Sequence, residues 1–352
     1  MSSVSVVIPS FNYAHYLPEC VHSALSQATP ELDVEVLVID DCSEDGTPVV
    51  GERLAAEDSR VEFRRHHKNR GHLATYDEGL AWAQGDYCVI LSADDLLVPG
   101  ALLRAARVLD AHPTVGFAYG RSLRFDNDGL RPPARTGEAR VRIWKGRDWI
   151  AQRCRTATNC ISSPEVVVRT SLQHRLGGYR IDLPHSGDLE MWLRLAAHAE
   201  VAFLGGVDQA YYRMHAASMA RTRFTTPLAD LRQRKAAFDA VFDDHGRFVA
   251  DPARLRAQAG RALAREALWA ACHGMDRTRL DAAAVHELEA FALGADPHAR
   301  RLSGYRGLRW RRGVQRRLGS GVLTWLPPAY ATVAVHRLQT WRWWRRWNAH
   351  GV

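Results

Sequence analysis

The sequence predicts an α/β domain with a mostly parallel central sheet, followed by a region of helices. Three observations support this fold class. Short runs of Val, Ile and Leu alternate with segments of helical apolar spacing from residue 4 to about residue 120. This pattern is typical of parallel strands that helices cover on both faces. Polar residues follow three of these runs, and residues from about 227 to 293 are rich in Ala, Arg and Leu with few β-forming residues.

The first part of the chain alternates strands and helices. Apolar runs predict strands at 4–9, 34–39, 61–64, 87–91 and 115–119, and the segments between them predict helices at 15–27, 47–57, 72–84 and 99–111. In the first of these helices, Leu17, Val21 and Leu25 repeat at the spacing that places apolar side chains on one face. The alternation therefore predicts repeated strand–helix units.

The pattern is weaker beyond residue 120. Pro, Gly and Arg are frequent in 121–145, which predicts a loop. Further along we expect helices at 147–153 and 188–198, strands at 165–168 and 201–204, and a turn at Gly177-Gly178. We predict two domains, residues 1–222 with the sheet and residues 223–352 with helices and a basic tail.

Charge and cysteine content limit the class of protein. The net charge is +8, yet twelve arginines and no acidic residue follow Pro297, which leaves about −4 (8 − 12) for residues 1–296. The six cysteines form no CxxC pair, which favours reduced thiols over disulfides or a zinc site. A strand close to the first residue leaves no room for a signal peptide, and no apolar run approaches the roughly 20 residues of a membrane span. We therefore expect a cytoplasmic protein, peripheral at the inner face of the membrane.

Three predicted strands end in polar residues that point to one site. They are followed by Ser10-Phe11-Asn12, by Asp40-Asp41 and by Asp94-Asp95. Ligands of such sheets bind at the carboxyl ends of the strands. Adjacent carboxylates after a buried strand are costly without a positive group, and a divalent cation with a phosphorylated ligand would supply one. The alternative is that these residues are ordinary turn residues or helix caps.

Five segments in this order resemble family 2 glycosyltransferases with the GT-A fold. They read VSVVIPSFN, VLVIDDCSEDGT, GDYCVILSADDLLVPGAL, GGY…GDLEMWLRLA and YRMH, and they cover about residues 2–220. The resemblance implies a nucleotide-sugar donor, Mg²⁺ or Mn²⁺ as cofactor, and single-displacement transfer to an acceptor hydroxyl with inversion at the anomeric carbon. The acceptor could be a saccharide, a lipid-linked sugar or a metabolite.

The resemblance also implies which residues bind the donor. Pro9 and Phe11 match positions beside the nucleobase, and Asp41 matches a residue that accepts a hydrogen bond from it. A carboxylate suits this role because a uracil-type imide presents an N–H donor. Arg70 is a candidate for contact with the base or the diphosphate, and its alternative is a solvated residue in the basic run 64–70.

The metal motif departs from the family pattern. The family's Asp-x-Asp is replaced by Ser92-Ala93-Asp94, so that Asp94 alone matches the ligand position. Asp95 would hold a metal-bound water or a donor hydroxyl, or cap the next helix. His215, in Tyr-Arg-Met-His, matches a position that contacts the metal or the diphosphate.

The resemblance implies that Asp188 is the general base. The family's Glu-Asp pair is Gly187-Asp188 here, and the alternative for Asp188 is an N-cap on the helix through His198. Glu190 is a second candidate for the base. Trp192 would line the acceptor pocket or, as an apolar helix face favours, pack in the core.

The basic tail and the two motif departures leave alternatives open. Trp and Arg occur together in 309–312 and 337–347, which suits contact with an anionic membrane surface. The alternatives are packing of the tail on its own domain, with solvated arginines, and a nucleic-acid patch, which ranks last. We expect no nucleic-acid partner. The rival functions are a nucleotidyltransferase, which would release inorganic diphosphate, and a catalytically silent nucleotide-sugar-binding protein.

Overall fold

The structure is a computed structural model that describes residues 1–126, 131–215, 226–277, 279–319, 323 and 327–352. Internal contacts divide the chain into two compact units. One unit, the sheet unit, comprises residues 1–149, 159–218 and 348–351, and the other, the helical unit, comprises residues 150–158, 219–347 and 352. The predicted domain boundary at 222/223 lies outside the described residues.

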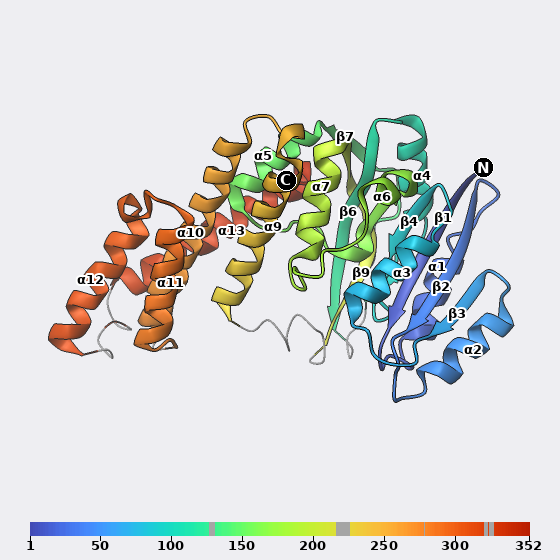
Figure 1. The fold of residues 1–352 in the computed structure, drawn as a ribbon, viewed down its shortest axis with the longest axis horizontal. Helices are drawn as coiled ribbons and strands as arrows, with labels where there is room; N and C mark the ends of the chain where they lie inside the picture. The colour runs from blue at the N-terminus through green and yellow to red at the C-terminus, as the bar shows by residue number, and fades with distance from the viewer. Residues whose placement is uncertain (127–130, 216–225, 278, 320–322, 324–326) are drawn as a thin grey trace. The chain divides into compact units, whose positions relative to one another are not determined.

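The sheet unit contains a nine-stranded sheet in its described residues (Figure 1). Its strands run in the order β3-β2-β1-β4-β8-β6-β9-β5, and β7 pairs with β9. The bounds are β1 Ser2–Ser10, β2 Leu32–Asp40, β3 Val61–Arg65, β4 Tyr87–Ile90, β5 Leu96–Leu97, β6 Val115–Asp126, β7 Arg140–Trp144, β8 Val166–Arg169 and β9 Glu200–Met214.

Four neighbouring strands, β3, β2, β1 and β4, run parallel to one another. The register sets Val4 against Val34 and Tyr87, and these three side chains are buried. Because the four strands are parallel, their carboxyl ends share one edge of the sheet. The predicted α/β fold class is confirmed, although the sheet is mixed, since β8 runs antiparallel to both β4 and β6.

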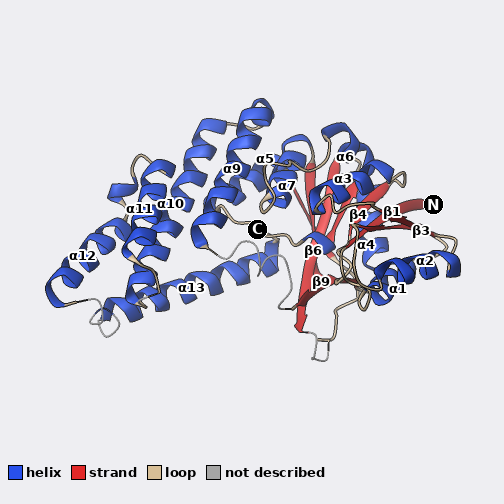
Figure 2. Cartoon of the chain, turned by 60° about the horizontal axis from the view of Figure 1, so that its bottom comes forward, coloured by secondary structure: helices blue, strands red, loops and turns tan. Residues whose placement is uncertain are grey.

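Helices cover both faces of this sheet (Figure 2). Their bounds are α1 Leu17–Leu25, α2 Thr47–Glu57, α3 His72–Trp82, α4 Ala101–Ala111, α6 Thr170–Leu176 and α7 Gly187–His198. Helix α5, Gly146–Thr156, begins in the sheet unit, and its residues from 150 on belong to the helical unit. Helix α3 packs very closely on β1 at Gly79, where an added Cβ would lie 2.0 Å from Cγ1 of Val7. The start of α3 lies at the carboxyl edge, because the backbone N–H of Gly71 donates to Asp41 just after β2.

The segment 121–145, which the sequence predicts as a loop, is partly strand. Strand β6 continues to Asp126, and Arg140–Trp144 forms β7. The reason is β9, a strand of 15 residues, of which the sequence predicts only 201–204. Its long backbone pairs with β6 on one side and β7 on the other, and these hydrogen bonds outweigh the local preference of the Pro, Gly and Arg residues for a loop.

The helical unit confirms the predicted helical region. It contains α9 Pro227–His245, α10 Pro252–Asp276, α11 Ala282–Ala295, α12 Ser303–Leu318 and α13 Pro327–His350. Side chains of Asp251 and Asp281 accept hydrogen bonds from backbone N–H groups at the starts of α10 and α11, as N-caps do. Among the described residues, no helix combines the length and apolar character needed to cross a bilayer.

Candidate active site

The loops that follow β1 and β2 hold each other in place. The backbone N–H of Asn12 donates to Oγ of Ser43 at 2.8 Å, and Oδ1 of Asn12 accepts from the N–H of Glu44 at 2.9 Å. Asn12 has a φ of 59°, a left-handed conformation that Asn tolerates better than most residues. The preceding Phe11 is 43% exposed. Its ring therefore stands at the carboxyl edge of β1, next to half-buried Pro9, and is accessible for stacking.

Asp41 lies at this edge but is engaged by the protein itself. Its carboxylate accepts the backbone N–H groups of Arg70 at 2.7 Å and Gly71 at 2.8 Å. Nδ1 of His66 lies 2.7 Å from Oδ1. The buried carboxylate thus fixes the segment 66–71 on the end of β2, and its predicted contact with a nucleobase remains a prediction.

The side chain of Arg70 is held beside this segment. Its guanidinium group donates to Oε2 of Glu78 at 2.6 Å, and Nε2 of His66 lies 3.0 Å from the same oxygen. Glu78 belongs to α3, so a network of two carboxylates, an imidazole and a guanidinium group ties the loop to that helix. Arg70 is exposed, and its role in donor binding remains a prediction.

Asp94 and His215, which are distant in the sequence, meet at the same edge. Asp94 follows β4, and His215 directly follows β9. Nε2 of His215 lies 2.8 Å from Oδ2 of Asp94, and the rings of Tyr13 and Tyr16 lie 5.7 Å from the imidazole. The structure therefore brings together the two predicted metal ligands.

The spacing of this pair is compatible with a shared cation. Two neighbouring ligands on octahedral Mg²⁺, with bonds of about 2.1 Å, stand about 3 Å apart. Among the described residues, no group of three or more His, Cys, Asp or Glu side chains forms a metal cage. The two donors therefore fit a cation that takes its other ligands from phosphate oxygens and water.

Asp95 is buried and supports the site from behind. Its Oδ1 accepts the backbone N–H of Arg213 at 2.8 Å, and Nε of Arg213 donates to the backbone carbonyl of Asp94 at 2.8 Å. Burial, with the neighbouring Asp94 carboxylate, raises the pKa of Asp95 well above its ordinary value. The alternative of a helix cap is wrong, because β5 intervenes and α4 starts at Ala101 after Gly100.

Asp188 lies in the first turn of α7 and faces a different loop. Its Oδ2 accepts a hydrogen bond from Oγ of Ser163 at 2.9 Å, and the Tyr179 hydroxyl also bonds to it. The N-cap position belongs to Ser186, so the cap alternative for Asp188 is wrong. Burial raises the pKa of Asp188, and the two hydrogen bonds oppose this shift only in part.

The neighbouring candidates on α7 are structural. Glu190 is buried and forms an ion pair with Arg194 at 2.9 Å, so its carboxylate is engaged within the protein, and the role of Asp188 as the base remains a prediction. Trp192 is buried, and its ring lies 5.9 Å from that of Phe117. Core packing, the alternative that the sequence favours for Trp192, is therefore correct.

Sequence reasoning misses Tyr76, Tyr179 and Glu165, which lie near these groups. The rings of Tyr76 and Tyr179 lie 5.2 Å apart. Burial raises the pKa of Tyr76, and the nearby charges of Asp188 and Asp94 raise it further, so Tyr76 lies near both of these aspartates. Tyr179 belongs to the GGY segment, but Tyr76 looks like any aromatic residue of an amphipathic helix, and no sequence signal distinguishes it.

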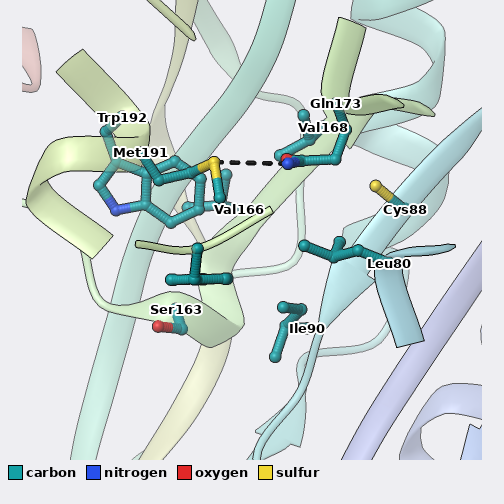
Figure 3. Close-up of a pocket in the computed structure, with 10 residues that line it drawn as sticks. Leu80, Cys88, Ile90, Ser163, Val166, Val168, Gln173, Met191 and Trp192 are labelled. Atoms are coloured by element: carbon teal, nitrogen blue, oxygen red, sulfur yellow. Dashed lines mark hydrogen bonds between the residues drawn. The ribbon is translucent and has the colours of Figure 1, made fainter. Parts of the chain in front are cut away.

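A small internal cavity lies next to the hydrogen-bond partners of Asp188. Its volume is about 20 Å³, and its lining includes Ser163, Tyr179 and Trp192. Figure 3 shows Leu80, Ile90 and Val166 on its other walls. This space suffices for about one water molecule, so the cavity is too small to receive a sugar.

Glu165 gives a pH-dependent prediction. It is buried, its Oε1 accepts the backbone N–H of Ser162, and burial raises its pKa to about 8. A raised carboxyl pKa stabilises the fold while the group is protonated, so this contribution falls as pH rises from about 4.5 to about 8. We expect Glu165→Gln to remove this pH-dependent contribution. The unfolding free energy of the variant should therefore fall by a few kcal/mol less than that of the original chain over this pH range.

Denaturant unfolding of both proteins from about pH 5 to about pH 9 measures this difference. Glu138→Gln, at an exposed glutamate, is the matched control and should follow the original chain. An equal pH slope for Glu165→Gln and the original chain would contradict the assignment.

Comparison with known proteins agrees with this geometry. Residues 5–167 match the family described as glycosyl transferase family 2. Over 92 residues the chain is 36% identical to the putative teichuronic acid biosynthesis glycosyltransferase TuaG of Bacillus subtilis, which covers 26% of this chain and 36% of that protein. The chain spans 14% to 69% of the length of seven further curated relatives that it matches.

Two solved structures share the fold. Staphylococcus aureus TarS 1–349 in complex with UDP-GlcNAc superposes with a TM-score of 0.63 at 16% identity, over 90% of this chain and 92% of that one. The mannosyltransferase PcManGT of Pyrobaculum calidifontis, in complex with GDP-Man and Mn²⁺, gives 0.54 at 20% identity over 95% and 86%. With the match over residues 5–167, these findings show that the chain contains a glycosyl transferase family 2 domain and has the GT-A fold.

Proposed function

We propose that this chain transfers a sugar from a nucleoside-diphosphate sugar to an acceptor hydroxyl, with inversion at the anomeric carbon. One observation carries the proposal: in a family 2 domain, Asp94 pairs with His215 at the carboxyl edge of the sheet, Asp188 bonds to Ser163 and Tyr179, and Tyr76 lies near both aspartates. A single displacement needs a group that holds the diphosphate, here Asp94 and His215 with a cation, and a base for the acceptor hydroxyl, here Asp188. Nucleotide-sugars in the two related structures support this class of donor.

The donor would lie along the edge of β1, β2 and β4. The exposed ring of Phe11, beside Pro9, is accessible for stacking on the nucleobase. Asp41 holds the segment of Arg70 and Gly71 that would border the base. Asp94 and His215 would hold Mg²⁺ or Mn²⁺ with the diphosphate, and Asp95 would keep the Asp94 loop in position through Arg213.

A bound divalent cation would supply positive charge that stabilises the departing nucleoside diphosphate. Asp188 would accept the proton of the acceptor hydroxyl as that oxygen attacks the anomeric carbon. Ser163 and Tyr179 would hold the carboxylate in one orientation. The raised pKa of Asp188 makes it a stronger base than an ordinary aspartate, because basicity increases with pKa.

Product analysis tests this proposal. A thermal-shift screen of nucleotide-sugars with Mn²⁺ first identifies a donor, and chromatography then identifies the products with saccharide, lipid-linked or small-metabolite acceptors. We expect release of the nucleoside diphosphate. Release of inorganic diphosphate would indicate the rival nucleotidyltransferase, and donor binding without turnover or hydrolysis would indicate a silent binding protein; either result would contradict the proposal.

A further inference from the structure

The helices α12 and α13 are strongly basic. Residues 297–352 contain twelve arginines and no Asp or Glu. Arg311 and Arg312 are used inside the helical unit, in ion pairs with Asp276 at 2.7 Å and Glu289 at 2.6 Å. In the described part of the chain no ion pair engages the exposed arginines of α12, which are Arg306, Arg309, Arg316 and Arg317.

One side of α13 combines exposed apolar groups with arginines. We define the α13 face by residues that recur at intervals of three and four and are all exposed: Ala334, Arg337, Leu338, Trp341, Trp344 and Arg345. Leu338 is 47% exposed, Trp341 53% and Trp344 41%, whereas Trp347 is only 4% exposed. The guanidinium group of Arg345 lies 4.8 Å from the centre of the Trp341 ring. The helix therefore buries one indole and presents two others to solvent.

We propose that the α13 face binds an anionic lipid bilayer. Trp341, Trp344 and Leu338 would enter the boundary between headgroups and acyl chains. Arg337 and Arg345, on the same helix, would bind lipid phosphates. In this arrangement α13 would lie parallel to the membrane surface. No helix among the described residues is suited to span a bilayer.

Charge and exposure disfavour the other occupants. A second copy of the α13 face would bring Arg337 and Arg345 against identical arginines with no acidic residue between them, which costs free energy. Nucleic acid would accept the arginines through its phosphates, but it would leave Leu338 exposed to water. An anionic bilayer satisfies both the charged and the apolar members of the face.

Vesicle sedimentation of the full chain tests the proposal. We expect binding to phosphatidylcholine vesicles that contain phosphatidylglycerol and much weaker binding to phosphatidylcholine alone. Trp341→Ser with Trp344→Ser should reduce binding about tenfold or more, and Arg337→Gln with Arg345→Gln about fivefold for each arginine. High salt should weaken binding of the original chain.

A matched control exists in the same unit. Phe248 is 46% exposed, and the guanidinium group of Arg247 lies 4.7 Å from its ring centre. Phe248→Ser with Arg247→Gln removes an equivalent exposed pair outside the α13 face and should leave vesicle binding unchanged. Circular dichroism and thermal unfolding check that each variant is folded.

The proposal would be overturned if the original chain did not bind anionic vesicles, or if the Trp341/Trp344 variant bound them equally well. Dimers that form without vesicles and that this variant dissociates, with no vesicle binding, would also overturn it. Selective binding of duplex DNA in place of vesicles would equally overturn it. All substitutions lie in the helical unit, whereas the residues assigned to the donor and the base lie in the sheet unit, so donor binding in solution should persist in every variant, and the inference can fail while the proposed function holds.

Discussion

Asp188→Asn is expected to lower the rate of sugar transfer by about 10²- to 10⁴-fold, the usual contribution of a general base. The amide keeps the size of the carboxylate and can still bond to Ser163 and Tyr179, so the fold and the donor site should persist. Steady-state rates with saturating acceptor and donor titration calorimetry measure the two effects separately. Transfer at the original rate would refute the assignment of the base.

Two related variants sharpen this test. Asp182→Asn removes an exposed carboxylate six residues earlier that pairs with Arg180, and it should leave transfer unchanged. Ser163→Ala removes a hydrogen bond that lowers the pKa of Asp188, so the base should become protonated at higher pH. The acidic limb of the rate profile, where activity falls as pH decreases, should therefore shift upward in Ser163→Ala, and a downward shift would contradict this role for Ser163.

The second large effect is expected at the pair of Asp94 and His215. Asp94→Asn and His215→Ala should each weaken donor binding in Mn²⁺ by about tenfold or more, which corresponds to about 1.4 kcal/mol. The reason is that each removes one of the two side chains that would hold the cation. Titration calorimetry with Mn²⁺ and with a chelator measures this difference.

The chelator distinguishes a metal role from a packing role. Without metal, the original chain and both variants should bind the donor equally weakly, whereas a packing defect would persist in chelator. His112→Ala, at an exposed histidine after α4, is the matched control. Original affinity of both site variants in Mn²⁺ would contradict the metal assignment.

The meeting of Asp94, Asp41 and the loop after β1 at one edge could be predicted from the sequence. Near-continuous apolar runs indicated parallel strands, and the carboxyl ends of parallel strands share an edge. The pairing of Asp94 with His215 came only through the family resemblance, because 121 residues separate them.

The partners of the site residues could not be predicted. The carboxylate of Asp41 accepts hydrogen bonds from the backbone N–H groups of Arg70 and Gly71. Any residue type can donate such a bond, so the sequence does not indicate it. Asp95 followed the pattern of a helix cap, but β5 separates it from α4. Glu165 and Tyr76 reach the site through tertiary packing, which local sequence preferences do not encode.

The most direct test of the account compares Asp188→Asn and Asp94→Asn side by side for turnover and for donor affinity in Mn²⁺. The account assigns the proton transfer to Asp188 and the donor-bound cation to Asp94. It therefore predicts that Asp188→Asn loses turnover and keeps the donor dissociation constant, whereas Asp94→Asn weakens donor binding in Mn²⁺ but not in chelator. Unchanged turnover in Asp188→Asn, or unchanged metal-dependent affinity in Asp94→Asn, would contradict it.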